Sequence, residues 1–488
     1  MSTKDEIKAD LAAAAGSEPD RGLGLASWVI AVARFIIVLD GTIMIVAIPS
    51  IQSSLHLSLA NLNWVINGYS LTFGGLMLVA GRVGDVFGRK NVFRVGLLVF
   101  GLASLLGGLA PNGTALILLR ALQGVGAAIA TPGALSLLVS TFPEGELRTR
   151  ALGLYGGMTG LASVVGLLLG GVLTTYAGWR WVLLVNVPVV IGLLLGVGTL
   201  KEGVLQRVKI DIPGAIAATL GIGALIYAIN RVGEHGWSDS VVIACLGGAA
   251  ILLVVFLLIQ RATSNPMIPR EVVRERGRAG ANIVTFIMSA GMFTTYYFLT
   301  LFMQQVLGYS ALRTGLMYLP FAIGFGIAAG GVGPGLLKAM SEKAALSIAL
   351  LLAAGGTVWF AFLTTHTSIF AVLIPASVVT GVGLGATAVV STSVGVRGID
   401  SSEAGIGSAL LTAGGQVGGA FGLAVLATVA ASTTKDAVAG ATMKDALTEG
   451  YTTGFWVAAG LYALCVVVTL VTVSPYARRE RSVAQRAA

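Results

Sequence analysis

Apolar runs alternate with short polar segments along nearly the whole chain. A run of about 20 apolar residues can cross the hydrocarbon core of a bilayer as an α-helix, so the pattern predicts an all-α membrane protein. At this length we count roughly fourteen runs. The predicted spans lie near residues 25–49, 62–83, 92–110, 114–141, 149–175, 181–200, 212–230, 240–260, 280–307, 315–337, 344–364, 368–395, 403–431 and 452–474.

Basic residues are distributed unevenly between alternate connections of these spans, and this predicts how the chain is oriented. One set of connections holds Lys4, Lys8 and Arg21; Arg89 and Lys90; Arg148 and Arg150; Arg397; and the clusters at residues 201–209, 261–278, 338–343 and 478–486. The opposite set holds only Arg180, Arg231, Arg313, Lys435 and Lys444. Since basic loops stay on the cytoplasmic side, we expect an even number of spans and both termini in the cytoplasm.

The spans divide into six, two and six. We expect a cytoplasmic N-terminal tail over residues 1–24, a six-helix bundle over 25–200, a two-helix insert with cytoplasmic linkers over 201–279, a second six-helix bundle over 280–474 and a cytoplasmic tail over 475–488. Two such bundles, related by an axis along the membrane normal, would enclose a substrate cavity between them. The polar segment 432–451 is long for a loop, and we expect a short helix in it.

The composition agrees with this class and excludes others. Apolar residues make up 56% of the chain and charged residues 11%, which is outside the range of soluble domains. The net charge of +9 comes from basic residues scattered through short loops, so it indicates membrane orientation rather than nucleic-acid binding. Cys245 and Cys465 stand in apolar runs and are expected to pack there, without a disulfide or a metal. We find no phosphate-binding loop, metal-ligand cluster or nucleophile–base motif, so we expect neither an enzyme nor a bound cofactor or metal.

Two glycines and three charged residues stand where the second predicted span ends and the third is about to begin: Gly81, Asp85, Gly88, Arg89 and Lys90. Glycine lets helix ends approach closely and turn sharply, and the charges can pair at the water interface. The segment resembles the signature loop between the second and third helices of the major facilitator superfamily (MFS), although Val86 stands where that family often has Arg. The resemblance implies a latch that closes the cytoplasmic side while the cavity faces outward.

Further segments resemble one branch of that family, the fourteen-helix drug:proton antiporters. Residues 39–49 resemble the signature of its first helix, with Ile45 in place of Asn. Other matches are Arg120, Gln123, Gly124 and Gly126, residues 179–181 and 186–188, residues 305–310, 314–315 and 319–320, and residues 416–419. The resemblance covers nearly the whole chain. It implies an MFS fold and a monomeric, proton-driven exporter of amphiphilic, cationic drugs or antibiotics in a bacterial cytoplasmic membrane.

The fifth predicted span departs from this branch at one position. It carries Gly166, Gly170 and Gly171, but Leu167 stands where the antiporter motif has proline. In the family the proline bends this helix beside the partner half, so its loss weakens the implication of antiport. The glycines would still allow close helix contact, either for packing alone or as part of the coupling.

Asp40 is the carboxylate that lies deepest in the predicted spans, and an ionisable group at this depth usually marks function. Desolvation favours the neutral form of a carboxylate, so Asp40 could carry a proton near neutral pH. The alternative is a fixed pair with an arginine that never titrates. Arg120 resembles the arginine that the family places beside the first helix. It could hold Asp40 ionised when close and release it when distant, or it could simply anchor to backbone carbonyls.

Arg34 lies six residues before Asp40, which is about 9 Å along a helix and about 120° around it. The two residues therefore do not share a face. Three roles stay open for Arg34: it could attract an anionic substrate, bend toward Asp40, or extend its side chain to the cytoplasmic interface.

Neutral polar side chains in the spans could line the cavity or form helix–helix hydrogen bonds. They are Asn67, Tyr69, Gln123, Tyr297, Gln304, Gln305 and Gln416. The expected partners are the lipid bilayer and a small-molecule substrate. Two other functions remain open: an MFS transporter of a metabolite, peptide or lipid, and a membrane protein of this fold that does not transport.

Overall fold

The computed structural model describes residues 24–142, 146–202, 211–263, 274–397, 404–438 and 442–474, together with Pro266 and Gly440. The predicted N-terminal tail apart from Gly24, the predicted C-terminal tail over 475–488, and much of both linkers around the insert lie outside these residues. Every regular element in the described part of the chain is a helix.

The helices of the first half are α2 (Leu25–Leu55), α3 (Leu59–Phe87), α4 (Arg89–Gly108), α5 (Gly113–Thr141), α6 (Glu146–Tyr176), α7 (Trp181–Leu184), α8 (Asn186–Gly196) and the 3₁₀ turn η1 (Val197–Thr199). Two helices follow, α9 (Ile212–His235) and α10 (Ser240–Ala262). The second half contains α12 (Arg276–Leu301), α13 (Ala311–Met317), α14 (Leu319–Ile327), α15 (Gly333–Ala339), α16 (Glu342–Phe360), α17 (Ile374–Gly395), α18 (Ala404–Ala437) and α19 (Met443–Thr472). It also has three π-helical turns, η2 (Phe302–Val306), η3 (Ala328–Val332) and η4 (Ile369–Leu373).

Among the described residues, 12 helical segments are long and apolar enough to cross a membrane. This confirms the all-α membrane class. Helices α3 and α6, with 29 and 31 residues, are not among these 12 segments but lie alongside them in the molecule. The expectation of a separate short helix in segment 432–451 was wrong, because α18 continues to Ala437 and α19 begins at Met443. The two spanning helices themselves take up most of this polar segment.

Short polar side chains mark where several helices begin. The side chain of Asn112 accepts a hydrogen bond from the backbone of Ala115 at 2.9 Å, and Asp239 accepts one from Val242 at 3.0 Å. Such caps satisfy backbone donors that have no partner within the helix. Arg231 also donates to Asp239 at 2.9 Å, and this hydrogen bond lowers the pKa of the Asp239 carboxyl to about 2. The cap of α10 therefore stays ionised at neutral pH.

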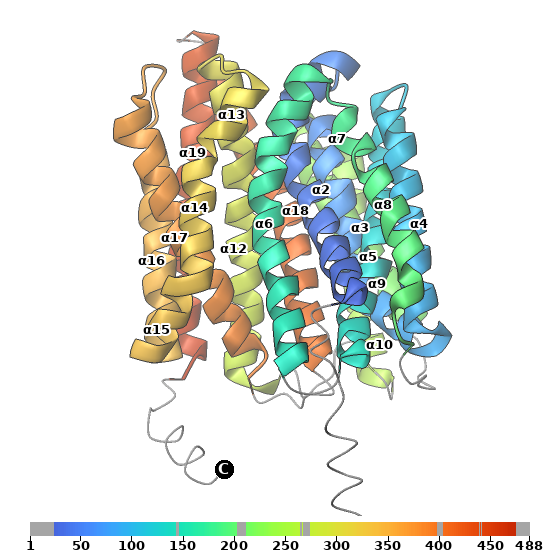
Figure 1. Cartoon of the computed structure of the whole chain (residues 1–488). Helices are drawn as coiled ribbons and strands as arrows, with labels where there is room; N and C mark the ends of the chain where they lie inside the picture. Colours follow the sequence, from blue (N-terminus) through green and yellow to red (C-terminus); the bar gives the residue numbers. More distant parts are fainter. Residues whose placement is uncertain are drawn as a thin grey trace, which may run out of the picture.

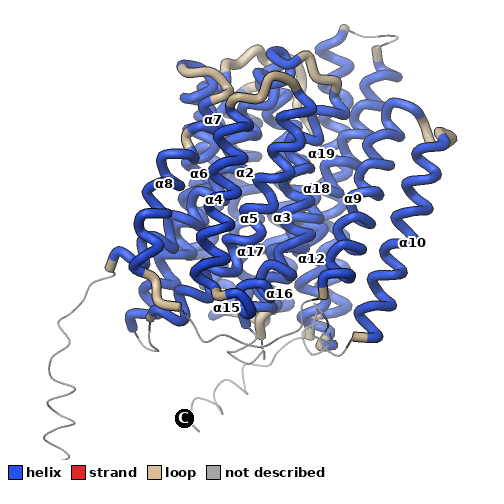
Figure 2. Tube along the Cα trace, turned by 90° about the vertical axis from the view of Figure 1, so that its right-hand side faces the viewer, coloured by secondary structure: helices blue, strands red, loops and turns tan. Residues whose placement is uncertain are grey.

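The helices pack as two groups that meet along two seams. In the first group α2 packs on α6, and α5 packs on both α3 and α4. In the second, α12 packs on α18, and α16 packs on α17 and α19. One seam joins α3 to α18, and the other joins α6 to α13. Helix α9 packs on both α3 and α18, while α10 packs on α9 and lies at the outer edge of the molecule (Figure 2).

Helix α2 begins and α19 ends at the same end of the bundle, the lower end in Figure 1, which we call the terminal end. Hydrogen bonds join the two groups at the opposite end. Gln304 donates to the carbonyl of Val46 at 3.0 Å, and the backbone of Leu312 donates to the Thr175 hydroxyl at 3.0 Å.

Candidate functional site

Asp40 lies inside the first helical group with none of its side chain exposed. One carboxylate oxygen, Oδ2, accepts a hydrogen bond from Nη1 of Arg120 at 2.5 Å. The other, Oδ1, accepts from the side-chain amides of Gln123 and Asn186, both at 2.7 Å. The three donors come from α5 and α8, so the carboxylate of α2 links these helices in the centre of the group.

Ser104 on α4 completes this network. Its hydroxyl oxygen accepts from the amide of Gln123 at 2.6 Å and from that of Asn186 at 2.9 Å. Arg120 and Gln123 are three residues apart, so they lie on one face of α5, and Arg120 donates to Gln123 Oε1 at 2.6 Å. Four helices thus contribute polar side chains to one buried network.

Arg120 has further partners on α3. Its Nε donates to the carbonyl of Val65 at 3.1 Å, and its guanidinium lies 4.4 Å from the centre of the Tyr69 ring. The Tyr69 hydroxyl donates to the carbonyl of Ile37 at 3.2 Å. The two roles considered for Arg120, carboxylate partner and backbone anchor, therefore occur together.

A buried ion pair of this kind contributes little net stability to a fold. Removing two charges from water costs several kcal/mol per ion, roughly what their attraction returns, whereas deleting one partner typically costs about 3–5 kcal/mol. The arrangement ties α2, α4, α5 and α8 together through one carboxylate and its hydrogen-bond partners.

Sequence reasoning missed Ser104 and Asn186 as members of this site. Asn186 belongs to a segment matched to the family, but its amide was not connected with Asp40. A polar amide inside an apolar span is a usable signal, because it must find a buried partner. Ser104 gave no such signal, since a serine hydroxyl in a helix can bond to the backbone of its own preceding turn.

Arg34 does not join the Asp40 network. Its Nε donates to the Thr159 hydroxyl on α6 at 3.1 Å, and its guanidinium lies 5.6 Å from the centre of the Tyr155 ring. The structure therefore does not show Arg34 bending toward Asp40. Arg34 is half-buried, on the part of α2 nearer the terminal end.

The expectation of a charged loop between the second and third spans was wrong, because Gly88 alone separates α3 from α4. Asp85 belongs to α3, whereas Arg89 and Lys90 belong to α4. Gly88 has φ +95°, a conformation that favours glycine, and a Cβ at Gly81 would lie 3.5 Å from Pro132. Lys90 donates through Nζ to the carbonyls of Gly198 and Leu200, each at 2.9 Å. Arg89 begins α4, and the side chain of Asp85 lies outside the described part of the structure.

The glycines of α6 lie where backbones approach closely. A Cβ at Gly170 would lie 2.6 Å from the carbonyl oxygen of Ile43 on α2, and one at Gly166 would overlap Thr42 of the same helix. A Cβ at Gly171 would lie 2.7 Å from the carbonyl oxygen of Ala311 on α13. Gly166 and Gly170 therefore bring α6 against its own group, and Gly171 brings it against the other.

Leu167, which replaces the motif proline, is buried. Its carbonyl oxygen lies 2.7 Å from where a Cβ at Gly315 would stand. Helix α6 contains no proline from Glu146 to Tyr176. The close approach between α6 and α13 is thus present without the motif proline.

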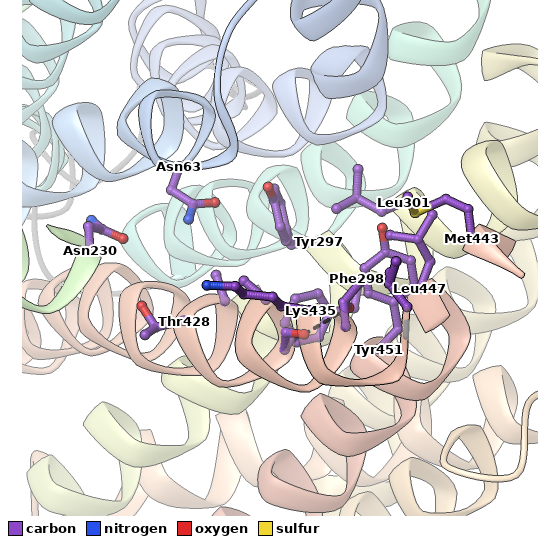
Figure 3. A pocket seen from close by; sticks show the side chains of 15 residues that line it. Asn63, Asn230, Tyr297, Phe298, Leu301, Thr428, Lys435, Met443, Leu447 and Tyr451 are labelled. Carbon is purple, nitrogen blue, oxygen red and sulfur yellow. Dashed lines mark hydrogen bonds between the residues drawn. The ribbon is translucent and has the colours of Figure 1, made fainter. Parts of the chain in front are cut away.

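The remaining polar candidates are dispersed. Asn67 is fully buried, with no hydrogen-bond partner for either amide atom among the described residues. Gln304 and Gln305 join the two groups at the end opposite the terminal end, through Val46 and, at 3.2 Å, Gln52. Gln416 lies against Gly74 at the seam of α3 and α18. Tyr297 lines a separate cavity (Figure 3).

The chain belongs to the Major Facilitator Superfamily, whose family model matches residues 30–423. This confirms the resemblance inferred from the motifs and identifies a membrane transporter fold rather than an enzyme.

Among its relatives, the puromycin resistance protein pur8 of Streptomyces alboniger is 38% identical over 97% of this chain and 96% of that protein. The cephamycin export protein CmcT of Amycolatopsis lactamdurans is 36% identical, covering 82% of this chain and 84% of that protein. The tetracenomycin C resistance and export protein of Streptomyces glaucescens is 30% identical, covering 83% and 76%.

Solved structures agree on the fold. The peptide transporter POT, solved in complex with sulfate, superposes with a TM-score of 0.66 over 96% of this chain and 98% of its own, at 14% identity. A bacterial homologue of the human lysosomal transporter Spinster gives 0.62 at 18% identity, covering 94% and 98%. At this identity the likeness concerns the fold alone.

Proposed function

We propose that this protein exports amphiphilic antibiotics or related drugs in exchange for protons. The observation that carries the proposal is the buried Asp40–Arg120 pair with its amide donors. The relatives named for antibiotic resistance and export support the direction and the class of substrate. No cofactor is required, because the proton gradient supplies the driving force.

We infer fourteen spans, made of the 12 segments that meet the length and hydropathy criteria together with α3 and α6. The uneven distribution of basic residues supports both termini in the cytoplasm. The division is a first six-helix bundle over 25–200, an insert over 201–279 and a second bundle over 280–474. The bacterial relatives support the cytoplasmic membrane as its location.

In this orientation the two bundles are closed toward the outside, where hydrogen bonds from Gln304 and Leu312 join them. The substrate enters between them from the cytoplasm or the inner leaflet, the bundles rock, and the substrate leaves on the outer side. The segment with Gly81, Asp85, Gly88, Arg89 and Lys90 latches the cytoplasmic end when the cavity faces outward. Gly171 supports this motion, because it lets α6 move along α13 at close range.

The coupling lies in the charge of Asp40. When ionised, Asp40 holds Arg120, Gln123 and Asn186 through charge-assisted hydrogen bonds, which are roughly twice as strong as neutral ones. A proton on Asp40 weakens all three bonds at once, so α2 can shift against α5 and α8. Loading and release of this proton on opposite sides of the membrane would drive the exchange.

Arg34 bears on the charge of the substrate. It is a half-buried cation toward the cytoplasmic end of α2, whereas the deep carboxylate of Asp40 is fully enclosed and already paired. A cationic drug would therefore meet a like charge before any free acid. We propose an amphiphilic substrate whose polar group is neutral or anionic near Arg34, in place of the cationic drug that the motifs first suggested.

The test uses purified protein in proteoliposomes with an imposed pH gradient. Puromycin, cephamycin, lincomycin and tetracenomycin C are added in turn, and proton movement and drug movement are both recorded. We expect drug-triggered proton flux in the wild type, reduced at least about ten-fold in Asp40→Asn, which removes the titrating charge. Asp436→Asn, an exposed aspartate at the end of α18, is the matched control and should behave as the wild type.

Other outcomes would redirect the proposal. Equal proton flux in the wild type and in Asp40→Asn would move the coupling site elsewhere. Drug movement without proton flux would mean uncoupled transport, with Leu167 as the departure from the antiporter motif that accounts for it.

A further inference from the structure

A cavity of about 360 Å³ lies at the end of the bundle away from the termini, outside the Asp40 network. Its walls come from three parts of the chain. Asn63 belongs to α3 of the first bundle, Asn230 to α9 of the insert, and Tyr297 and Lys435 to α12 and α18 of the second bundle. The volume falls in the range of small-molecule sites.

One end of this cavity is polar and incompletely satisfied. Asn230 is only 4% exposed, yet neither of its amide atoms has a hydrogen-bond partner in the described part of the chain. The carbonyl oxygen of Asn63, on a side chain that is 5% exposed, also has none. Buried amides without partners are rare because each one costs stability. Nδ2 of Asn230 is therefore a donor free for a ligand oxygen, whereas Oδ1 of Asn230 and Oδ1 of Asn63 are acceptors that can take a ligand O–H.

Lys435 supplies a positive charge at the same end. In Figure 3 its side chain extends toward the side of the cavity where Asn63, Asn230 and Thr428 lie. Lys435 forms no ion pair with the described residues. Thr428 donates to the carbonyl of Ile229 at 3.1 Å, which fixes α18 against α9 beside the Asn230 amide.

The other end of the cavity is apolar. Phe298 and Leu301 of α12 face Met443 and Leu447 of α19 there (Figure 3). Tyr451 closes this end, with its hydroxyl donating to Gln305 at 2.8 Å. The cavity therefore matches an amphiphile, because one of its ends is charged and the other is apolar.

We propose that this cavity binds an anionic amphiphile, a single apolar chain that carries an oxyanion head such as a carboxylate or a phosphate. The head lies at Lys435 and accepts from the Asn230 amide, and the chain lies among Phe298, Leu301, Met443 and Leu447. A membrane lipid and a free fatty acid share this chemistry.

Ligand binding at this site depends on the relative positions of the two bundles and the insert. Its walls belong to both bundles and to the insert, so the ligand binds best when all three are together as they are here. A ligand that prefers one arrangement shifts the population toward it. The insert thus contributes directly to a site at the outer end, rather than only covering the seam of α3 and α18.

The experiment measures binding, so its outcome is independent of whether the protein exports drugs. Purified full-length protein in detergent is labelled with a palmitic acid that carries a photoreactive diazirine on its chain, and the labelled peptides are identified by mass spectrometry. We expect labelling within residues 297–301 and 438–451, which line the apolar end. Hexadecyl phosphate and palmitate should compete for it, whereas hexadecanol, which lacks the charge, should compete about ten-fold less well.

Three variants separate this site from general attraction to a surface. Lys435→Gln should weaken labelling about ten-fold, and Asn230→Leu should weaken it by filling the polar end. Lys444→Gln removes an exposed lysine at the same end of the molecule that does not line the cavity, and it should label as the wild type does. Stronger competition by lysophosphatidic acid than by palmitate would assign the site to a lipid, and the reverse to a free acid. Labelling confined to residues outside 297–301 and 427–451, or equal labelling of Lys435→Gln and the wild type, would overturn the proposal.

Discussion

Each oxygen of the Asp40 carboxylate has its own donors, and these donors hold one another in place. Gln123 and Asn186 both bridge Asp40 and Ser104, so each amide proton has a defined acceptor. The role proposed for Asp40 depends on these donors.

Asn186→Leu tests the hydrogen bonds around Asp40 without replacing either charged residue of the pair. The change leaves Oδ1 of Asp40 with Gln123 as its remaining donor and takes a donor from Ser104. We expect a loss of about 1–3 kcal/mol in the free energy of unfolding and a clear reduction in drug-triggered proton flux. Thermal unfolding in detergent and the proteoliposome assay measure the two effects. Asn61→Leu, an exposed amide at the start of α3, is the matched control. A fully active Asn186→Leu would show that Asp40 works without this donor.

At the level of elements, helix α6 has two glycine faces with different neighbours. Gly166 and Gly170 face α2, whereas Gly171 faces the backbone of α13 across the seam. Close backbone approach between helices depends on small residues. The face at Gly171 is therefore the part of α6 that moves against the other bundle in the proposed cycle.

Gly171→Ala should impair transport because its Cβ would stand 2.7 Å from the carbonyl oxygen of Ala311. The helices must separate, at a cost of about 1–3 kcal/mol for overpacking, and we expect transport to fall about ten-fold while each bundle stays folded. Gly157→Ala on the same helix is the control, since a Cβ there meets no atom within 4 Å. Initial rates of drug uptake into inverted vesicles measure both variants. Equal rates would remove Gly171 from the moving seam.

At the scale of the whole molecule, hydrogen bonds from Gln304 and Leu312 join the two bundles at the end away from the termini. A transporter that works by alternating access must break these contacts when it opens toward that side. The α3–α18 seam is additionally covered by α9, whereas α6 meets α13 with no insert helix between them.

A cross-link at the closed end should stop the cycle. The Leu312 amide donates to the Thr175 hydroxyl at 3.0 Å across the seam, so Thr175→Cys with Leu312→Cys can form a disulfide in a background carrying Cys245→Ser and Cys465→Ala. We expect oxidation to abolish export and a reductant to restore it. Thr175→Cys alone should be insensitive to both treatments. Undiminished export by the cross-linked protein would show that this end does not open.

The sequence alone determined the class of the protein, because a bilayer demands long apolar helices and leaves a regular pattern of spans and basic loops. It also singled out Asp40 and Arg120, since charges at membrane depth are costly enough to stand out. Only the tertiary structure showed that Ser104 and Asn186 complete their network and that Arg34 turns to Thr159. It also revealed the cavity around Asn230, whose amide atoms have no hydrogen-bond partner among the described residues. These features depend on contacts between residues far apart in the chain, and the one-dimensional pattern of apolar and polar positions records burial but not which buried groups meet.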